Sequence, residues 1–120
     1  MTVQIQQVSD TFSVSPQLSP ADVQTLAEQG IKSLICNRPD GEGVDQVNVT
    51  EIETAAAAVG METVYLPVVS GNFEARDIDA FRAAVERLPS PVHAYCRTGT
   101  RSITLWALYQ RRLGTPVSQL

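Results

Sequence analysis

Apolar and polar residues alternate along this chain in short runs that predict strands and helices in turn. Residues 3–8 and 11–15 alternate with a period of two, and the pair Ser9-Asp10 between them is typical of a tight turn. We therefore expect the chain to begin with a hairpin. Three later runs are short and apolar, as expected for buried strands: residues 31–36, 63–69 and 91–95.

Segments with helical periodicity separate these strands. In the first of them, Ser19 is a favourable N-cap, Pro20 suits the first helical position, and Gly30 stands where a helix commonly ends. Apolar residues recur every three or four positions in three further segments, which we expect to be helices: residues 50–59, 75–88 and 102–113.

The alternation of strands and helices predicts an α/β fold with three layers, in which helices flank both faces of a mostly parallel central sheet. Ligands of such sheets bind beyond the carboxyl ends of the strands. Three loops are therefore expected at one rim, formed by residues 37–43, 70–74 and 96–101. The 120 residues suffice for one domain. Residues 114–120 resemble a helix end followed by the start of another element, which indicates a chain cut from a longer polypeptide.

Composition and charge exclude several classes of partner. The net charge is −4 and no basic stripe is present, which argues against nucleic acid. No apolar stretch is long enough to cross a membrane, and no signal peptide is visible, so we expect a cytoplasmic protein with free thiols. With two cysteines and a single histidine, the chain lacks the ligands for a structural zinc site, and no cofactor is expected.

The segment that follows the last predicted strand carries the clearest chemistry: Cys96-Arg97-Thr98-Gly99-Thr100-Arg101-Ser102. A thiol at this position faces successive backbone N–H groups and the positive end of a helix dipole, and both stabilise a thiolate. The same nest of amides binds an oxyanion, which an arginine fork can grip. Although a lone cysteine is usually a core residue, two arginines and a glycine around it favour a nucleophile.

Three segments resemble the phosphatase-like domain of the beta-lactamase hydrolase-like proteins, a bacterial relative of the dual-specificity phosphatases. They are residues 34–42 (LICNRPDGE), 65–68 (YLPV) and 95–108, which run from the cysteine loop into Leu105-Trp106-Ala107-Leu108. The resemblance covers nearly the whole chain. It implies a dual-specificity-phosphatase-like fold in which the N-terminal hairpin precedes the parallel sheet.

The resemblance also implies roles for the residues of the loop. Cys96 is the expected nucleophile, Arg101 holds the oxyanion, and Ser102 assists departure of the thiolate, although it can equally cap the helix. Four loop residues are expected to bind substrate: Arg97, Thr98, Gly99 and Thr100. Some related phosphatases form a reversible disulfide between the nucleophile and a second cysteine. Cys36 is placed for that role, or it is a buried apolar thiol.

A phosphatase also requires a general acid to protonate the leaving oxygen. Related enzymes carry an aspartate on the loop that corresponds to residues 69–74, where this chain has none. Asp40 and Glu42, on another loop of the same rim, are the better candidates. Their alternative reading is ordinary turn chemistry, since Pro-Asp-Gly favours a turn. His93 and Trp106 are expected to pack in the core.

The length of the loop leaves a second activity open. Protein tyrosine phosphatases place five residues between cysteine and arginine, whereas four separate Cys96 from Arg101, as is common in rhodanese sulfurtransferases. Fold does not decide chemistry. The expected substrate is a phosphorylated protein or small phosphate ester, or else a sulfur donor that forms a Cys96 persulfide. A non-catalytic phospho-ligand-binding or accessory module is the third reading.

Overall fold

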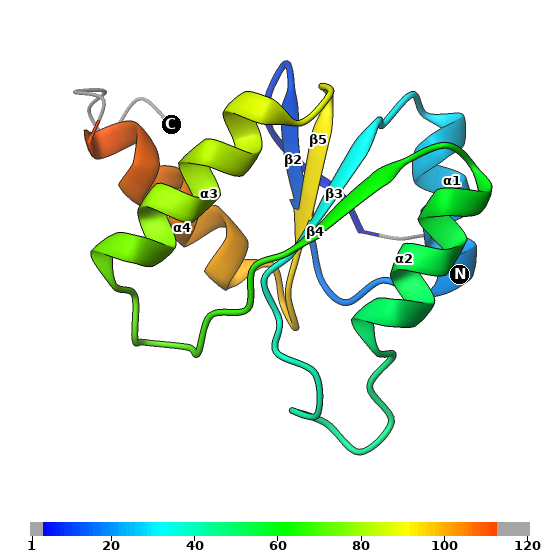
Figure 1. The fold of residues 1–120 in the computed structure, drawn as a ribbon, viewed down its shortest axis with the longest axis horizontal. Coiled ribbons are helices and arrows are strands. Elements are labelled where there is room, and N and C mark those ends of the chain that lie inside the picture. Colours follow the sequence, from blue (N-terminus) through cyan, green and yellow to red (C-terminus); the bar gives the residue numbers. More distant parts are fainter. Residues whose placement is uncertain (1–3, 113–120) are drawn as a thin grey trace.

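A computed structural model of the chain describes residues 4–112, which form a five-stranded sheet between two pairs of helices (Figure 1). The order of the strands across the sheet is β1-β2-β5-β3-β4, and all neighbours are parallel except β1 and β2. The strands are β1 (Gln6–Ser9), β2 (Phe12–Ser15), β3 (Ser33–Cys36), β4 (Glu62–Tyr65) and β5 (Val92–Tyr95). The helices are α1 (Pro20–Glu28), α2 (Val49–Ala58), α3 (Ala75–Arg87) and α4 (Thr100–Arg112).

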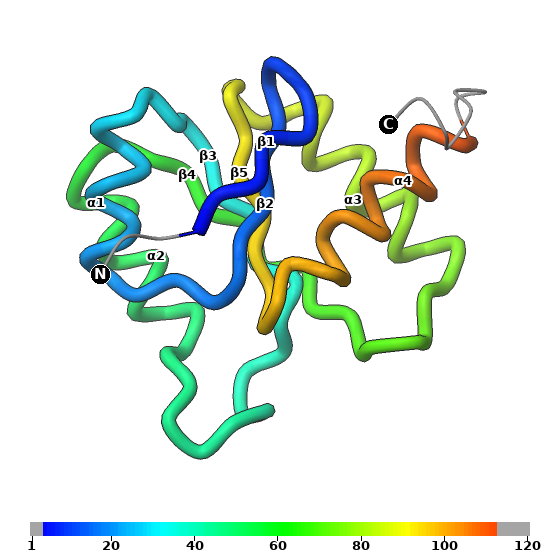
Figure 2. The backbone as a smooth tube through the Cα atoms, turned by 180° about the vertical axis from the view of Figure 1, so that it is seen from behind, coloured from blue at the N-terminus to red at the C-terminus, as the bar shows by residue number. Residues whose placement is uncertain are grey.

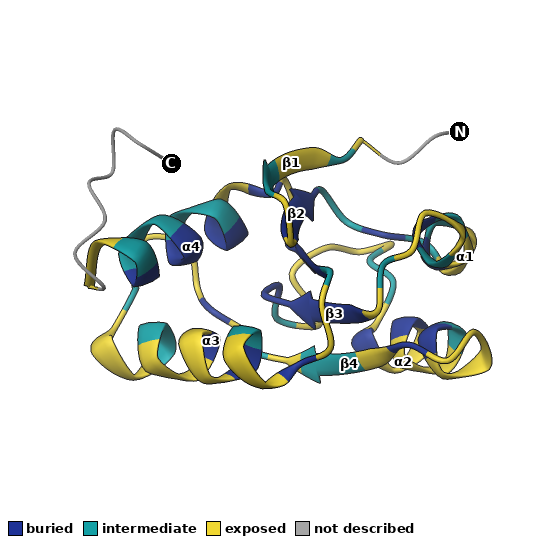
Figure 3. Cartoon of the chain, turned by 90° about the horizontal axis from the view of Figure 1, so that it is seen from above, coloured by how far each residue is buried: buried dark blue, intermediate teal, exposed yellow. Residues whose placement is uncertain are grey.

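The three expected layers are present, with α1 and α2 on one face of the sheet and α3 and α4 on the other (Figures 1 and 3). The hairpin of β1 and β2 occupies one edge, so that β2 lies between β1 and the central strand β5 (Figure 2). The prediction of a mostly parallel α/β sheet with an N-terminal hairpin is thus confirmed.

Alternation along the central strands distributes their side chains between two cores. In β2, Phe12 and Val14 face α3 and α4, while in β3 Leu34 and Cys36 face α1 and α2. Tyr95 of β5 is in register with Cys36 and lies in the same core. All four residues of β2, β3 and β5 are buried, as expected of strands covered on both faces (Figure 3).

Aromatic rings fill the core beneath α3 and α4. The Trp106 ring stacks on that of Phe12, with centroids 4.3 Å apart, and Phe81 and Tyr109 meet this pair edge-on. Burial of such a side chain contributes about 1.5–3 kcal/mol. The prediction that Trp106 packs in the core is confirmed.

The first helix begins and ends where the sequence predicts. The Ser19 hydroxyl accepts from the Asp22 N–H at 3.2 Å, and the Asp22 carboxylate accepts from the Ser19 N–H at 2.8 Å. Pro20 opens the helix, and Gly30 follows its end with a φ of 91°, in the region that favours glycine.

Several other boundaries differ from the prediction by one to four residues, and two of them lie next to the cysteine loop or the segment after β4. The strand expected over residues 63–69 is Glu62–Tyr65. Beyond it, the Leu66 N–H donates to the Cys36 carbonyl at the end of β3 and the Val68 N–H donates to the Asn37 carbonyl. The last helix begins at Thr100, two residues early, with the Gly99 carbonyl accepting from the Ile103 N–H at 3.1 Å. The predicted features at residues 3 and 113–120 lie outside the described residues.

Within residues 4–112, no helix has both the length and the apolar character that crossing a bilayer requires. In the same range, no group of three or more His, Cys, Asp and Glu side chains is arranged to hold a metal ion.

His93 is fully buried beside β2, where two serine hydroxyls hold its ring. The Ser13 oxygen lies 2.7 Å from Nδ1, and the Ser15 oxygen lies 2.8 Å from Nε2. Because the Ser15 hydroxyl donates to the Pro16 carbonyl, the Nε2–H donates to Ser15 and the Ser13 hydroxyl donates to Nδ1. The neutral ring is therefore satisfied at both nitrogens, and burial lowers its pKa from 6.5 to about 4. The prediction of a packed strand histidine is confirmed.

This histidine makes folding stability depend on pH. The unfolded chain takes up a proton near pH 6.5 and the folded chain only near pH 4, so the stabilisation is complete above pH 6.5 and is lost as the pH falls towards 4. The loss amounts to about 3 kcal/mol. Urea unfolding between pH 4 and pH 7 measures it, with His93→Gln as the reference because glutamine does not titrate. Equal pH slopes in the two proteins would contradict the assignment.

Candidate active site around Cys96

The carboxyl ends of β3, β4 and β5 lie at one rim of the sheet, where the loops that follow them meet (Figure 1). Direct contacts join these loops. The Arg101 side chain, from the start of α4, reaches Glu42 in the loop after β3 and the Val68 carbonyl after β4. The Ser102 hydroxyl donates to the Asn37 side chain at 2.9 Å. These contacts confirm that the loop of residues 37–43 meets the cysteine loop, as the sequence predicts. On the side of β4, the contact is made by Val68, just before the predicted loop of residues 70–74.

Cys96 directly follows β5 and is fully buried at the centre of this rim. The Gly99 N–H donates to its sulfur at 3.0 Å. Burial alone would raise the pKa of the Cys96 thiol, but the N–H groups of Ser102, Thr98, Arg101 and Gly99 together lower it below the usual value. A thiol held in this way is a thiolate over a wider range of pH and is a candidate nucleophile.

The backbone of the loop is fixed by the strand beside it. The Cys96 N–H donates to the Ser15 carbonyl at 3.4 Å, and the Gln17 N–H donates to the Arg97 carbonyl at 3.3 Å. Gly99 adopts a φ of 94°, and a Cβ at this position would meet the Ser15 backbone at 3.4 Å. Glycine is therefore favoured here for its backbone angle.

Arg101 forms a two-pronged ion pair with Glu42. Its Nη1 and Nη2 donate to the two carboxylate oxygens at 2.7 and 2.8 Å, and Nη1 also donates to the Val68 carbonyl at 2.9 Å. Arg38 donates to the same carboxylate from Nε at 3.1 Å. The hydrogen bond from Arg101 lowers the pKa of Glu42, and its counterpart raises the pKa of Arg101.

These contacts bear on the two carboxylates considered for the general acid. Glu42 is ionised and shared by two arginines, which makes it a partner of the guanidinium groups and an unsuitable proton donor. Asp40 is exposed, and its Oδ1 accepts from the Val49 N–H at 2.9 Å at the start of α2. Its second carboxylate oxygen forms no hydrogen bond with the described residues. Asp40 as the acid therefore stays a prediction.

Ser102 and Asn37 form a buried connection that sequence reasoning missed. Besides accepting from Ser102, Asn37 donates from Nδ2 to the Leu66 carbonyl at 3.0 Å. The Ser102 hydroxyl is thus directed to Asn37, while its backbone N–H faces the Cys96 sulfur. One feature of the sequence could have identified Asn37 as a site residue: it is the first polar residue after an apolar strand.

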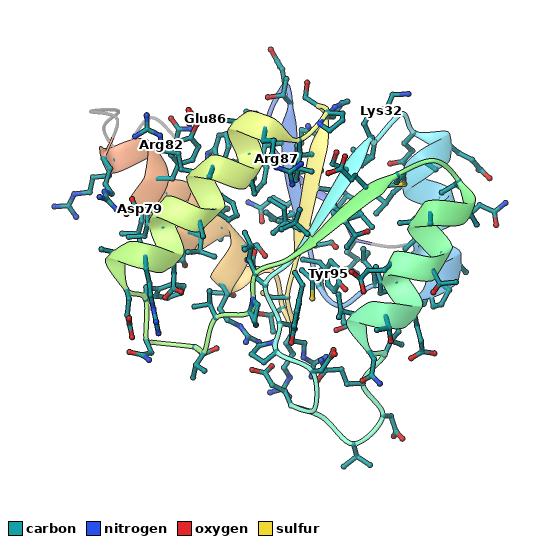
Figure 4. All side chains as sticks on the ribbon, viewed as in Figure 1. Lys32, Asp79, Arg82, Glu86, Arg87 and Tyr95 are labelled. Atoms are coloured by element: carbon teal, nitrogen blue, oxygen red, sulfur yellow. The ribbon has the colours of Figure 1, made fainter. Side chains whose placement is uncertain are left out.

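Cys36 lies at the end of β3, in register with Tyr95. Its thiol donates to the Arg38 carbonyl at 3.3 Å, and burial raises its pKa. Figure 4 places Tyr95 on the α2 side of the sheet. Cys96 directly follows Tyr95, so the two cysteines stand at the ends of neighbouring strands. Both cysteines are free, and the Cys36–Cys96 disulfide stays a prediction.

The fold has close counterparts among phosphatases. A crystal structure from Neisseria meningitidis, described as a candidate phosphatase, superposes with a TM-score of 0.87 at 35% identity and covers 94% of this chain and 80% of its own. The core catalytic domain of the PP-IP phosphatase SIW14 from S. cerevisiae matches with a TM-score of 0.77 over 99% of this chain and 72% of its own, at 13% identity. The chain therefore has the phosphatase fold of the tyrosine and dual-specificity class.

Sequence comparison specifies the family. The model of the beta-lactamase hydrolase-like protein, phosphatase-like domain, matches residues 4–112. The beta-lactamase hydrolase-like protein of Agrobacterium fabrum is 37% identical over 101 residues, which are 84% of this chain and 23% of that protein. This chain belongs to the phosphatase-like domain family of the beta-lactamase hydrolase-like proteins. It spans about a quarter of the length of the curated relatives it matches.

The two thiols should titrate separately. The thiolate of Cys96 is expected to form below the pH at which a free cysteine titrates, about 8.5. Burial raises the pKa of Cys36, so its thiolate should form only at higher pH. Thiolate absorbance in the ultraviolet, followed against pH, should show an early step that Cys96→Ser removes. The matched control Cys36→Ser should retain that step, and its loss in this control would contradict the assignment.

Proposed function

We propose that this domain is a cysteine-dependent phosphatase that hydrolyses phosphate monoesters through a phosphocysteine at Cys96. The observation that carries the proposal is the convergence of four backbone N–H groups on the Cys96 sulfur, together with the guanidinium of Arg101. A buried thiolate stabilised by fixed donors is a nucleophile, and the same donors suit the negative charge of a phosphoryl group.

The ion pair with Glu42 leaves Arg101 able to bind that group. A guanidinium has five N–H bonds, and those of Arg101 to Glu42 and Val68 use three of them. The Nε–H and one Nη2–H remain, and these two lie on one edge of the planar group. The negative charge of Cys96 contributes to the raised pKa of Arg101, which supports a guanidinium close to the sulfur. Glu42 thus orients Arg101 while its remaining fork can take two phosphoryl oxygens.

The reaction then has two steps. The Cys96 thiolate attacks phosphorus, a P–S bond forms, and the P–O bond to the leaving group breaks. The leaving oxygen takes a proton from the general acid. Water next attacks phosphorus, the P–S bond breaks with its electrons returning to sulfur, and inorganic phosphate leaves while the proton lost by water passes to the same carboxylate. Ser102 contributes its N–H to the departing thiolate.

Cys96→Ser should abolish hydrolysis of p-nitrophenyl phosphate, because an un-ionised hydroxyl replaces the thiolate. Cys36→Ser is the matched control and should retain activity. Circular dichroism of both variants verifies the fold. Turnover by Cys96→Ser above a few per cent of the wild-type rate would contradict the proposal.

The four-residue spacing between Cys96 and Arg101 is the one feature that favours sulfur transfer instead, through a persulfide on Cys96. The same two variants distinguish the activities when thiosulfate and cyanide replace the phosphate ester. Thiocyanate formation that depends on Cys96, without phosphatase activity, would establish the sulfurtransferase. Absence of both activities, with phosphate still bound, would indicate a binding module.

Asp40 is proposed as the general acid, and its substitution tests the role. Asp40→Asn keeps an oxygen that can accept from Val49 but cannot supply the proton, so alkyl phosphates should be hydrolysed about 10²–10⁴-fold more slowly. Hydrolysis of p-nitrophenyl phosphate should fall much less, because that leaving group needs no proton. Asp45→Asn, in the same loop, is the control. Equal rates for Asp40→Asn and wild type on alkyl esters would exclude Asp40.

A further inference from the structure

A hollow of about 210 Å³ adjoins the Cys96 loop on the side of the segment that follows β4. It is smaller than the pockets that enclose drug-sized ligands, so it suits a small chemical group. Its lining residues come from that segment, from the loop and from the first turns of α4: Ser70, Gly71, Phe73, Arg97, Thr98, Thr100, Arg101 and Thr104.

The charge of this hollow is wholly positive. Its only charged lining residues are Arg97 and Arg101, and none of the eight is a carboxylate. Arg97 is exposed and makes no ion pair within residues 4–112. Six other arginines in that range are paired with a carboxylate: Arg38, Arg76, Arg82, Arg87, Arg101 and Arg112. In a chain of net charge −4, an unpaired arginine beside the nucleophile is available for an anion.

Hydroxyl groups add neutral donors to the same hollow. Thr100 and Thr104 lie one helical turn apart on α4, and the Thr98 hydroxyl donates to that of Thr100 at 3.0 Å. The partly buried Phe73 packs against the core and forms a fixed apolar wall. An oxyanion in this hollow would meet a guanidinium and hydroxyls, with no carboxylate to repel it.

We propose that this hollow is a subsite for a second phosphate of the substrate, held by Arg97 next to the phosphoryl group that Cys96 attacks. The proposal rests on the proposed phosphatase function and narrows its substrate class to compounds that carry two neighbouring phosphates. The second phosphate is either joined to the first as an anhydride or esterified at an adjacent position of the same molecule. The chemistry of recognition is the same for both.

Binding to catalytically inactive protein tests the subsite apart from turnover. In the Cys96→Ser background, isothermal titration with inorganic phosphate reports the loop, and titration with methylenebisphosphonate reports the loop and the hollow together. A charge-assisted contact predicts that the bisphosphonate binds at least about tenfold more tightly than phosphate. Adding Arg97→Gln should remove most of this difference, and Arg97→Lys should restore part of it.

Arg82→Gln is the matched control, since Arg82 lies on α3 in an ion pair with Glu86, away from the rim (Figure 4). It should preserve the preference for the bisphosphonate. Phosphate binding without that preference, or a preference that survives Arg97→Gln, would overturn the subsite and leave the proposed function standing. Failure to bind either anion would overturn both.

Turnover by the protein with Cys96 intact distinguishes the two sources of the second phosphate. Pyrophosphate represents the anhydride, and a vicinal bisphosphate ester represents adjacent phosphates. Arg97→Gln should raise the KM for p-nitrophenyl phosphate little. For whichever of the two bisphosphate substrates belongs to the natural class, the same substitution should raise KM about tenfold more. Equal effects of Arg97→Gln on all three substrates would show that Arg97 acts on the nucleophile and would contradict the subsite.

Discussion

The ion pair between Arg101 and Glu42 is the interaction on which the geometry of this site depends. It joins the first turn of α4 to the loop after β3, across 59 positions of sequence. The Arg101 side chain is 7% exposed, so without Glu42 its buried charge would keep only the Val68 carbonyl and the Cys96 sulfur as partners. The Glu42 side chain is 29% exposed, so the pair is partly buried, and loss of one member should cost less than the about 3–5 kcal/mol typical of a fully buried pair. Glu42 therefore fixes both the direction of the guanidinium and the closure of the rim.

The chemistry at sulfur depends more on the main chain than on side chains. Four N–H groups of the loop and the first turn of α4 face Cys96, and their positions follow from where the helix begins. Because α4 begins at Thr100, the N–H groups of Arg101 and Ser102 are among those that no carbonyl of the helix can accept. These two N–H groups belong to the first turn of the helix, and the helix geometry fixes their direction towards Cys96.

Local features of this molecule could be predicted from sequence, and distant contacts could not. The capping of α1 by Ser19, the buried strands and the cysteine loop are encoded within a few residues, so pattern and turn chemistry identify them. The bonds of Arg101 to Glu42 and of Ser102 to Asn37 join segments about 60 residues apart. Their partners depend on the strand order, which the sequence pattern leaves open. The same limit applied to His93, whose burial was predictable and whose two serine partners were not.

Because β2 lies beside the cysteine loop, the N-terminal hairpin helps to determine the conformation of that loop. Ser15 and Gln17 hold the loop by main-chain bonds, and Gly99 lies against the backbone of Ser15 and Pro16, although the hairpin and the loop are about 80 positions apart. Substitutions on the hairpin can therefore shift the loop without changing any residue within it. Relatives with identical loops and different hairpins can then differ in thiol reactivity, and transplanting the loop alone onto another sheet would not transfer its properties.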